Sequence, residues 1–386
     1  MALIRKLKAF IAVLVLLPAT SLLAVEYNMR KGATEVSHLA YDLHMMAVYV
    51  VFAIGVVTFG VMFYSMWAHR RSANPEPAKF SHSTVVEIIW TAIPLIILIL
   101  LAIPATKTLL LMEDTETDAD MTVLVTGSQW KWHYKYLDGE QKDIEFFSHL
   151  TTSRDLIEDY DGQAEKDKGD IYLLDVDNPL VIPTGKKVRI LLTSDDVIHS
   201  WWVPDFAVKK DAIPGFINEA WTRVDEPGVF RGQCTELCGK DHGFMPIVVE
   251  VKAQSEFASW VEGQQQAKVE AEKAAMADSS KVWTMDELMK LGMDVYNARC
   301  AACHKADGTG MPPVFPAMIA SPMVTGPVSD HIGIVVHGKA GTAMQAFGAQ
   351  LTDAEIAAVV TYERNAWGNN TGDLVQPADV AASKSN

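Results

Sequence analysis

Two long runs of apolar residues stand out in the first third of the sequence, at about residues 44–67 and 85–112. At a rise of about 1.5 Å per residue, each is long enough as a helix to cross a hydrocarbon core of about 30 Å. The loop between them, residues 68–79, carries an excess of positive charge, which is typical of cytoplasmic loops. We therefore predict a transmembrane hairpin within residues 25–112, with both ends and all that follows on the outer side.

An alternation of apolar and polar residues begins at Met121 and predicts half-buried strands. Turn signals such as Asp138-Gly139 separate the strands, and their short, even spacing is typical of a β-sandwich or barrel. We place this domain at residues 113–252. The expected strands are 121–126, 130–136, 171–174, 180–182, 187–193 and 220–224, with an exposed loop at 155–170.

Helical spacing of apolar residues replaces the alternation after residue 252. Residues 253–281 predict a helical linker, and residues 282–368 predict an all-α domain. Two of its helices are expected to begin at the capping boxes Thr284 to Glu287 and Thr352 to Glu355. Residues 369–386 are predicted to be a disordered tail.

The N-terminal residues 1–24 have the pattern of a secretory signal peptide. Arg5, Lys6 and Lys8 precede an apolar run at residues 9–17, and small residues follow up to Ala24. The alternative is a first transmembrane helix. A signal peptide agrees with the positive loop of the hairpin, because both place the β-domain outside the cytoplasm.

The net charge and the cysteine content limit the possible functions of the chain. The 386 residues carry a formal net charge of −15, which argues against nucleic acid binding because phosphate needs clustered Lys and Arg. The four cysteines fall in two close pairs, Cys234 with Cys238 and Cys300 with Cys303. Two disulfides are one interpretation, but a histidine follows each pair closely, which a disulfide does not need.

The first cysteine pair lies in a loop between two strand-like segments. Cys234, Cys238 and His242 have a C-x₃-C-x₃-H spacing, and Met245 follows. Two thiolates favour zinc, copper(I) or iron–sulfur, and the thioether favours copper. One blue copper needs a single thiolate, so the second suggests two copper ions. His199, at the end of a predicted strand, is the best candidate for another imidazole, although a histidine beside two tryptophans is usually a packed one.

The second pair lies in Cys300-Ala-Ala-Cys303-His304, the signature of c-type haem attachment. Both thiols add to the haem vinyl groups, and the adjacent His304 is held under the iron. A thioredoxin-like pair would need a βαβ surround that this pattern lacks. A zinc site would need two more ligands, for which the sequence offers only the scattered His331 and His337.

A sixth haem ligand is expected from the far side of the ring, where a methionine would raise the potential. Met311 is too near His304 to pass round the ring, and Met318 and Met323 lie in a Pro-rich stretch. Met344 lies in a Gly-containing loop just before the last helix, which favours it as the ligand.

Glu87 is unusual because a carboxylate at the start of a membrane helix is costly and often functional. Helix capping is an alternative explanation for an acid at this position. Thr84 to Glu87 reads as a capping box, and an acid in the first turn complements the helix dipole. The residues alone favour the cap.

A membrane hairpin, a β-domain with the Cys234 loop and His199, and a c-type haem domain, in this order, resemble subunit II of a cytochrome c oxidase with a fused cytochrome c. The resemblance covers about residues 27–367. It implies a cupredoxin-like sandwich with a dinuclear copper centre held by two His, two bridging Cys, one Met and one backbone carbonyl. The matching positions are His199, His242, Cys234, Cys238, Met245 and the carbonyl of Glu236.

The resemblance also implies roles for four other side chains. Glu236 would reach a magnesium or manganese ion at the interface with subunit I, and Asp211 matches an acid near that ion, unless it is an ordinary turn residue. Trp130 matches the aromatic through which electrons reach the copper, the alternative being that it only packs on the sandwich. Glu87 matches the entrance of a proton channel into subunit I.

The function implied by the resemblance is electron transport in the respiratory chain with proton translocation. Cytochrome c or another redox donor would reduce the haem c, and electrons would pass through the copper pair to subunit I, where oxygen is reduced to water. The expected partners are oxidase subunits I and III in a bacterial inner membrane, with the copper and haem domains in the periplasm. The alternatives are a subunit of a nitric oxide reductase and a structural zinc domain with Cys₂His₂ ligation.

Overall fold

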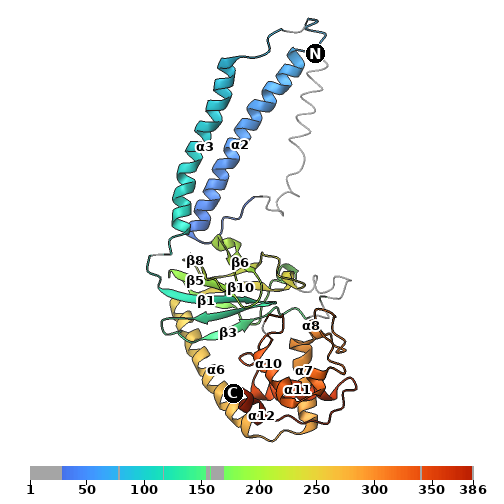
Figure 1. Cartoon of the computed structure of the whole chain (residues 1–386). Helices are drawn as coiled ribbons and strands as arrows, with labels where there is room; N and C mark the ends of the chain where they lie inside the picture. Colours follow the sequence, from blue (N-terminus) through green and yellow to red (C-terminus); the bar gives the residue numbers. More distant parts are fainter. Residues whose placement is uncertain are drawn as a thin grey trace.

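Three parts follow one another in the computed structural model, a helical hairpin, a β-sandwich and a helical domain (Figure 1). The structure describes residues 28–76, 79–115, 117–153, 157, 169–339 and 341–384. The predicted signal peptide lies outside the described residues, as does most of the predicted loop at 155–170. The sandwich lies between the hairpin and the helical domain (Figure 1).

The hairpin consists of α2 (Glu35–Ala68) and α3 (Thr84–Met112). Both are long and apolar enough to cross a membrane, and the part of each that could span it is not buried within the chain. This confirms the two predicted apolar helices, although α2 begins nearer the N-terminus than expected. There Thr34 and Ser37 form a reciprocal capping box.

The predicted capping box between Thr84 and Glu87 is wrong. Thr84 is already the first residue of α3, its N-cap is Ser83, and Ser83 makes no side-chain capping bond. Glu87 nevertheless lies in the first turn, where its charge complements the helix dipole. This end of α3 is the end remote from the sandwich (Figure 1).

The sandwich is built from two five-stranded sheets, ordered β3-β2-β1-β5-β8 and β4-β10-β9-β6-β7. The strands are β1 Met121–Ser128, β2 Lys131–Tyr136, β3 Glu145–Ser148, β4 Leu180–Pro183, β5 Val188–Ser194, β6 His199–Val203, β7 Val208–Ala212, β8 Asn218–Thr222, β9 Gly228–Cys234 and β10 Pro246–Lys252. Side chains from both sheets, among them Val125, Leu192 and Ile247, form one buried core. The predicted β-sandwich is confirmed.

One predicted strand is wrong, and three strands were not predicted. Residues 171–174 form no strand, because Gly169–Ile171 is a short 3₁₀ helix followed by a turn. The strands β3, β6 and β7 were not predicted. β7 is a charged edge strand in which Lys209 and Asp211 face outward, so its sequence shows no apolar run, and β3 has only four residues.

The helical domain follows the long linker helix α6 (Gln254–Ser280). Its helices are α7 Met285–Arg299, α8 Ala301–His304, α9 Pro322–Thr325, α10 Val328–His337, α11 Asp353–Asn365 and α12 Pro377–Lys384. The predicted capping boxes at Thr284 and Thr352 are both present. Helices α7 and α11 cross closely at Gly292, where a Cβ atom would lie 2.1 Å from the carbonyl oxygen of Ala358.

The predicted disordered tail is in part ordered. Residues 377–384 form α12, whose Val380 is fully buried, and Val375 before it is almost fully buried in the same core. Gln376 also exchanges two hydrogen bonds with the backbone of Trp283. The sequence pattern missed this helix because only two of its side chains, at Pro377 and Val380, are buried.

We expect Gly292→Ala to destabilise the helical domain by about 1–3 kcal/mol, because the new methyl group forces α7 and α11 apart. The matched control is Gly333→Ala in α10, where a Cβ meets nothing within 4 Å and alanine raises helix propensity. Calorimetry of the full chain in detergent measures both. Equal unfolding temperatures for the two variants would contradict the close crossing.

Candidate metal centre and haem-attachment segment

The first cysteine pair lies where two strands of one sheet meet. β9 and β10 are antiparallel, Gln233 pairs with Pro246, and the connection between them is residues 235–245, here called the ligand loop. Cys234 is the last residue of β9, and Met245 directly precedes β10. The ends of the loop are therefore fixed by the sheet, as the sequence predicted.

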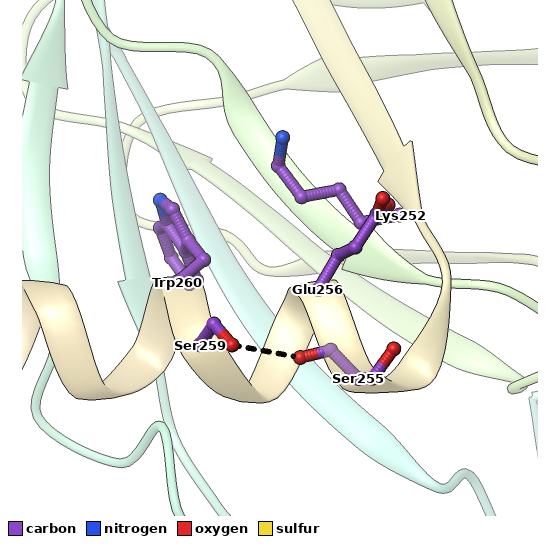
Figure 2. Close-up of a pocket in the computed structure, with 5 residues that line it drawn as sticks. All are labelled: Lys252, Ser255, Glu256, Ser259 and Trp260. Carbon is purple, nitrogen blue, oxygen red and sulfur yellow. Dashed lines mark hydrogen bonds between the residues drawn. The ribbon is translucent and has the colours of Figure 1, made fainter.

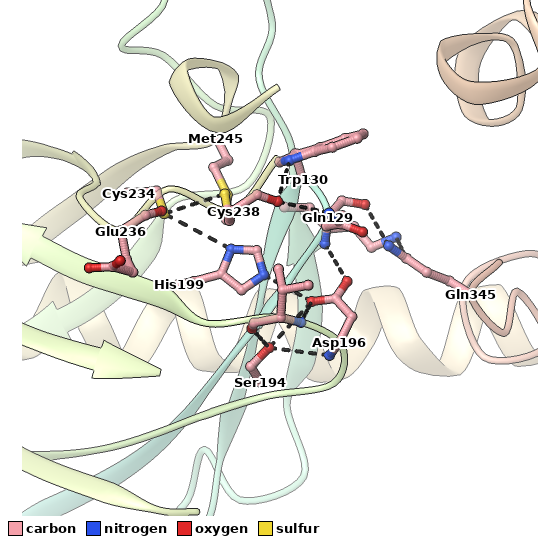
Figure 3. Close-up of polar contacts among 12 residues, drawn as sticks. Gln129, Trp130, Ser194, Asp196, His199, Cys234, Glu236, Cys238, Met245 and Gln345 are labelled. Carbon is pink, nitrogen blue, oxygen red and sulfur yellow. Dashed lines mark hydrogen bonds and ion pairs between the residues drawn. The ribbon is translucent and has the colours of Figure 1, made fainter. Parts of the chain in front are cut away.

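Each cysteine sulfur has an imidazole beside it, and Figure 3 shows that of His199 next to Cys234. The Sγ atoms of Cys234 and Cys238 lie 3.8 Å apart. Nδ1 of His199 lies 3.9 Å from the sulfur of Cys234, and Nδ1 of His242 lies 3.4 Å from that of Cys238. Ligand atoms of His199, Cys234 and Cys238 lie within 4.8 Å of one another, and all three residues are buried.

Two weaker donors complete this cluster. The sulfur of Met245 lies 3.6 Å from that of Cys238, and the carbonyl oxygen of Glu236 lies 3.5 Å from that of Cys234. Met245 is almost fully buried. The structure thus brings together all six donor groups that the resemblance implied, from β6, β9 and the ligand loop.

The two thiols cannot both ionise easily on their own. A hydrogen bond with Cys238 lowers the pKa of Cys234 to about 3, and the same contact raises the pKa of Cys238. The first proton leaves readily, but a second negative charge 3.8 Å away in a buried site is repelled. A bound cation removes this repulsion, so the cluster is suited to hold metal.

Asp196 orients His199 and was missed by sequence reasoning. Its Oδ1 lies 2.9 Å from Nε2 of His199, so the imidazole presents Nδ1 to the cysteine sulfur. Burial alone would raise the pKa of Asp196, but bonds from His199 and from the backbone N–H groups of Gln129 and Val197 lower it. A carboxylate three residues before a candidate ligand was the available signal.

Trp130 lies on the turn between β1 and β2, against the ligand loop. Its indole Nε1 donates to the carbonyl oxygen of Cys238 at 3.3 Å, and Nε2 of Gln129 donates to the same oxygen at 2.8 Å. Trp130 is half-buried and packs against the sandwich core. Trp130 therefore touches the backbone of Cys238 while remaining partly exposed.

The other acidic candidates lie apart from the sulfur cluster. The side chain of Glu236 is exposed and points away from the sulfurs (Figure 3). Asp211 is exposed on β7, paired with Ser200, the residue after His199. Glu87 lies at the far end of the hairpin, remote from this site (Figure 1).

The second cysteine pair lies where α7 ends and the short helix α8 follows. Cys300 is the C-cap of α7, and α8 contains Cys303 and His304. Nδ1 of His304 donates to the carbonyl oxygen of Pro316 at 2.9 Å, which leaves Nε2 available as a ligand. All four cysteines lie in the described part of the chain, and none forms a disulfide.

The candidate sixth ligand, Met344, is half-buried in the loop between α10 and α11. Its carbonyl oxygen accepts a hydrogen bond from the backbone of Lys339. Met318, one of the three competing residues, packs instead against the helical core, and its backbone N–H donates to the carbonyl oxygen of Gly308.

The helical domain contacts the sandwich beside Trp130. Nε2 of Gln345, the residue after Met344, donates to the carbonyl oxygen of Gln129 (Figure 3). Nζ of Lys240 in the ligand loop donates to the carbonyl oxygen of Ala302, inside the haem-attachment signature. The loop of Gln345 thus contacts the turn that carries Trp130, and the segment of Ala302 contacts the ligand loop that carries Cys238.

An open hollow at the start of α6 does not belong to this site (Figure 2). It is lined by Lys252, Ser255, Glu256, Ser259 and Trp260. Lys252 pairs with Glu250, and the hydroxyl of Ser259 bonds to the backbone of Ser255. These are ordinary solvated groups of a helix start, and they suggest no chemistry.

Comparison with protein families gives three matches along the chain. The transmembrane domain of cytochrome C oxidase subunit II matches residues 22–108, and the periplasmic domain of the same subunit matches residues 121–252. Subunit III of the cbb3-type cytochrome C oxidase matches residues 287–362, a region that includes the C-x-x-C-H segment. The three matched regions correspond to the hairpin, the sandwich and the helical domain.

Two related proteins agree with the matches to subunit II. A probable cytochrome c oxidase subunit 2 of Rickettsia bellii is 39% identical over 64% of this chain and 86% of its own length. One from Rickettsia prowazekii is 40% identical over 63% of this chain and 74% of its own length. The solved periplasmic domain of cytochrome oxidase subunit II from Bradyrhizobium japonicum is 43% identical, covers 39% of this chain and 96% of that chain, and gives a TM-score of 0.33.

We expect Asp196→Asn to weaken metal binding about 10- to 100-fold, because an amide cannot accept all the hydrogen bonds that Asp196 accepts and the orientation of His199 is lost. Asp195→Asn is the matched control, since it removes the neighbouring carboxylate, which makes no bond to His199. Metal titration of the full chain in detergent measures both affinities. Equal losses of metal affinity in the two variants would show that Asp196 acts only through its negative charge and not by orienting His199.

Proposed function

The chain belongs to the cytochrome c oxidase subunit II family, and on this premise we propose that it carries electrons from a haem c on its helical domain to a dinuclear copper centre on its sandwich, for delivery to the oxygen-reducing subunit. As a subunit of a haem-copper oxidase, the chain works in a complex with other oxidase subunits. Its family implies copper binding, and its cytochrome c domain implies haem c binding.

The donor set favours two copper ions over one zinc ion. Each thiol has its own imidazole, which suits a pair of metals that share both sulfurs better than one tetrahedral ion. Met245 and the carbonyl of Glu236 would be surplus for a Cys₂His₂ zinc site. When bound, such a pair of coppers would accept and release one electron, and the ligand loop together with strands β6 and β9 would keep the six donors in place.

The helical domain suits a covalently held haem. Cys300 and Cys303 would form the two thioether bonds, and His304, oriented by Pro316, would ligate the iron through Nε2. We assign Met344 as the sixth ligand.

The contact beside Trp130 is the observation that carries the proposal. Gln345, next to Met344, is bonded to Gln129, and the Trp130 ring is bonded to the backbone of Cys238. A short path therefore joins the loop that carries Met344, here called the haem-binding loop, to Cys238 through the Gln345 amide, the backbone of Gln129 and the Trp130 ring. This supports Trp130 as the residue through which electrons reach the copper.

The remaining assignments rest on the family alone. Glu236 and Asp211 are exposed, as a shared magnesium or manganese site at a subunit interface would require. Glu87 lies at the end of α3 remote from the sandwich, as an entrance on the cytoplasmic side would require. We also propose that the chain assembles with subunits I and III in a bacterial inner membrane, with its sandwich in the periplasm. The complex would couple electron transfer to proton translocation, and cytochrome c or another redox protein would be the donor.

Metal content tests the copper assignment. We expect the purified full chain to hold about two copper ions and Cys238→Ser to lose copper while keeping its haem, because the serine hydroxyl is a poor ligand for copper. Elemental analysis and visible spectra measure both. Zinc in place of copper, with no copper–thiolate absorption, would refute the assignment.

Trp130→Phe tests the electron path. Phenylalanine keeps an aromatic ring but loses the bond from Nε1 to Cys238, and we expect haem-to-copper transfer to slow by roughly tenfold or more. Flash photolysis of the assembled oxidase measures the rate, and both metal spectra should be unchanged. Trp260→Phe, on α6 and away from the metal ligands, is the control. An unchanged rate in Trp130→Phe would remove Trp130 from the path.

A further inference from the structure

Lys131 is a buried cation between the two soluble parts of the chain. It is the first residue of β2 and follows Trp130, yet only 7% of it is exposed. Its ammonium lies 2.6 Å from Oε1 of Gln345 and 2.6 Å from Oε1 of Gln350. Both glutamines precede α11, so one side chain of the sandwich bonds to two of the helical domain.

Aromatic rings complete the surroundings of this ammonium. Nζ of Lys131 lies 5.2 Å from the ring centre of Phe147 on β3 and 5.6 Å from that of Phe347 in the loop before α11. Each distance is within the range in which a cation is attracted by a ring face. The two rings come from opposite sides of the interface, so the ammonium joins both domains through them as well.

Burying this charge is costly, which makes its partners important. Burial, with a smaller effect of Arg299, lowers the pKa of Lys131 to about 8, while Asp196 and Asp195 act against the shift. The side chain thus remains largely protonated at pH 7. An ammonium in this position without its two amide acceptors would be a buried charge without hydrogen bonds, a strongly destabilising arrangement.

We propose that Lys131 is a positioning residue that docks the helical domain on the surface around Trp130. Its acceptor Gln345 directly follows Met344, and the amide of Gln345 also donates to Gln129 on the other side of Trp130. Residues on both sides of Trp130 are therefore bonded to one haem-binding loop. This inference rests on the proposed function, in which that loop delivers electrons to Trp130.

If Lys131 docks the helical domain, removing its two acceptors should harm docking more than removing the acceptors and the ammonium together. Replacing Gln345 and Gln350 together by leucine leaves the Lys131 ammonium without acceptors, so the docked state should be strongly disfavoured. Adding Lys131→Met to these two changes removes the charge and leaves an apolar contact of similar size. Breaking a buried polar contact from one side is costly, whereas replacing the ammonium and both amides by apolar groups is often nearly neutral. The carbonyl oxygen of Gln129 loses its Gln345 donor equally in both variants.

The experiment uses the assembled oxidase with its metals. We expect haem-to-copper transfer to slow at least about tenfold in the double leucine variant and to return to within about threefold of the wild type in the triple variant. Both variants carry leucine beside Met344, so a direct effect on the haem would appear equally in both. Gln265→Leu, a linker glutamine that bonds to Glu140, is the control and should transfer at the wild-type rate.

Hydrogen exchange provides a readout that does not depend on electron transfer. We expect faster exchange in residues 128–133 and 345–351 of the double variant, and recovery in the triple variant. A slow rate in both variants, or unchanged exchange in the double variant, would overturn the role of Lys131. If the wild type transferred no electrons but showed protection that followed this pattern, the proposed function would fail and the docking contact would stand.

Discussion

Two buried cysteine sulfurs held 3.8 Å apart, one at the end of β9 and one in the ligand loop, are the constraint on which the rest of this molecule depends. Two thiolates at that distance repel each other, so the arrangement is stable in its fully ionised form only around a cation. The sandwich supplies the rigidity that keeps the sulfurs together. Cys234 ends β9, Met245 precedes β10, and His199 begins β6, the neighbour of β9 in the same sheet.

The turn between β1 and β2 connects this cluster to the helical domain. Gln129 and Trp130 donate to the backbone of Cys238, while the carbonyl of Gln129 and the ammonium of Lys131 bond to Gln345. Three consecutive residues thus contact the ligand loop on one side and the haem-binding loop on the other. A displacement of this turn would change its contacts with both loops together, because the three residues are consecutive in one backbone segment.

The sequence predicted the parts of the site that depend on residue type, and it missed those that depend on packing. Spacing alone identified Cys234, Cys238 and His242, since soft ligands in one loop restrict the chemistry. Asp196 was missed because its role arises only when β6 folds beside β9. The two apolar helices were predictable from composition, whereas the edge strand β7 was not, because charged side chains hide its alternation.

The ordered tail changes how the helical domain is expected to reach the copper domain. A flexible tether raises only the effective concentration of its two ends, and most of its conformations are undocked. Here α6 buries Phe257 and Val261 in the sandwich core at its start, and Gln376 ahead of α12 bonds to Trp283, just beyond its other end. The helical domain is thereby held along the linker before Lys131 engages. Such preorganisation lowers the entropy cost of docking, so the proposed contact of Lys131 has less of that cost to offset.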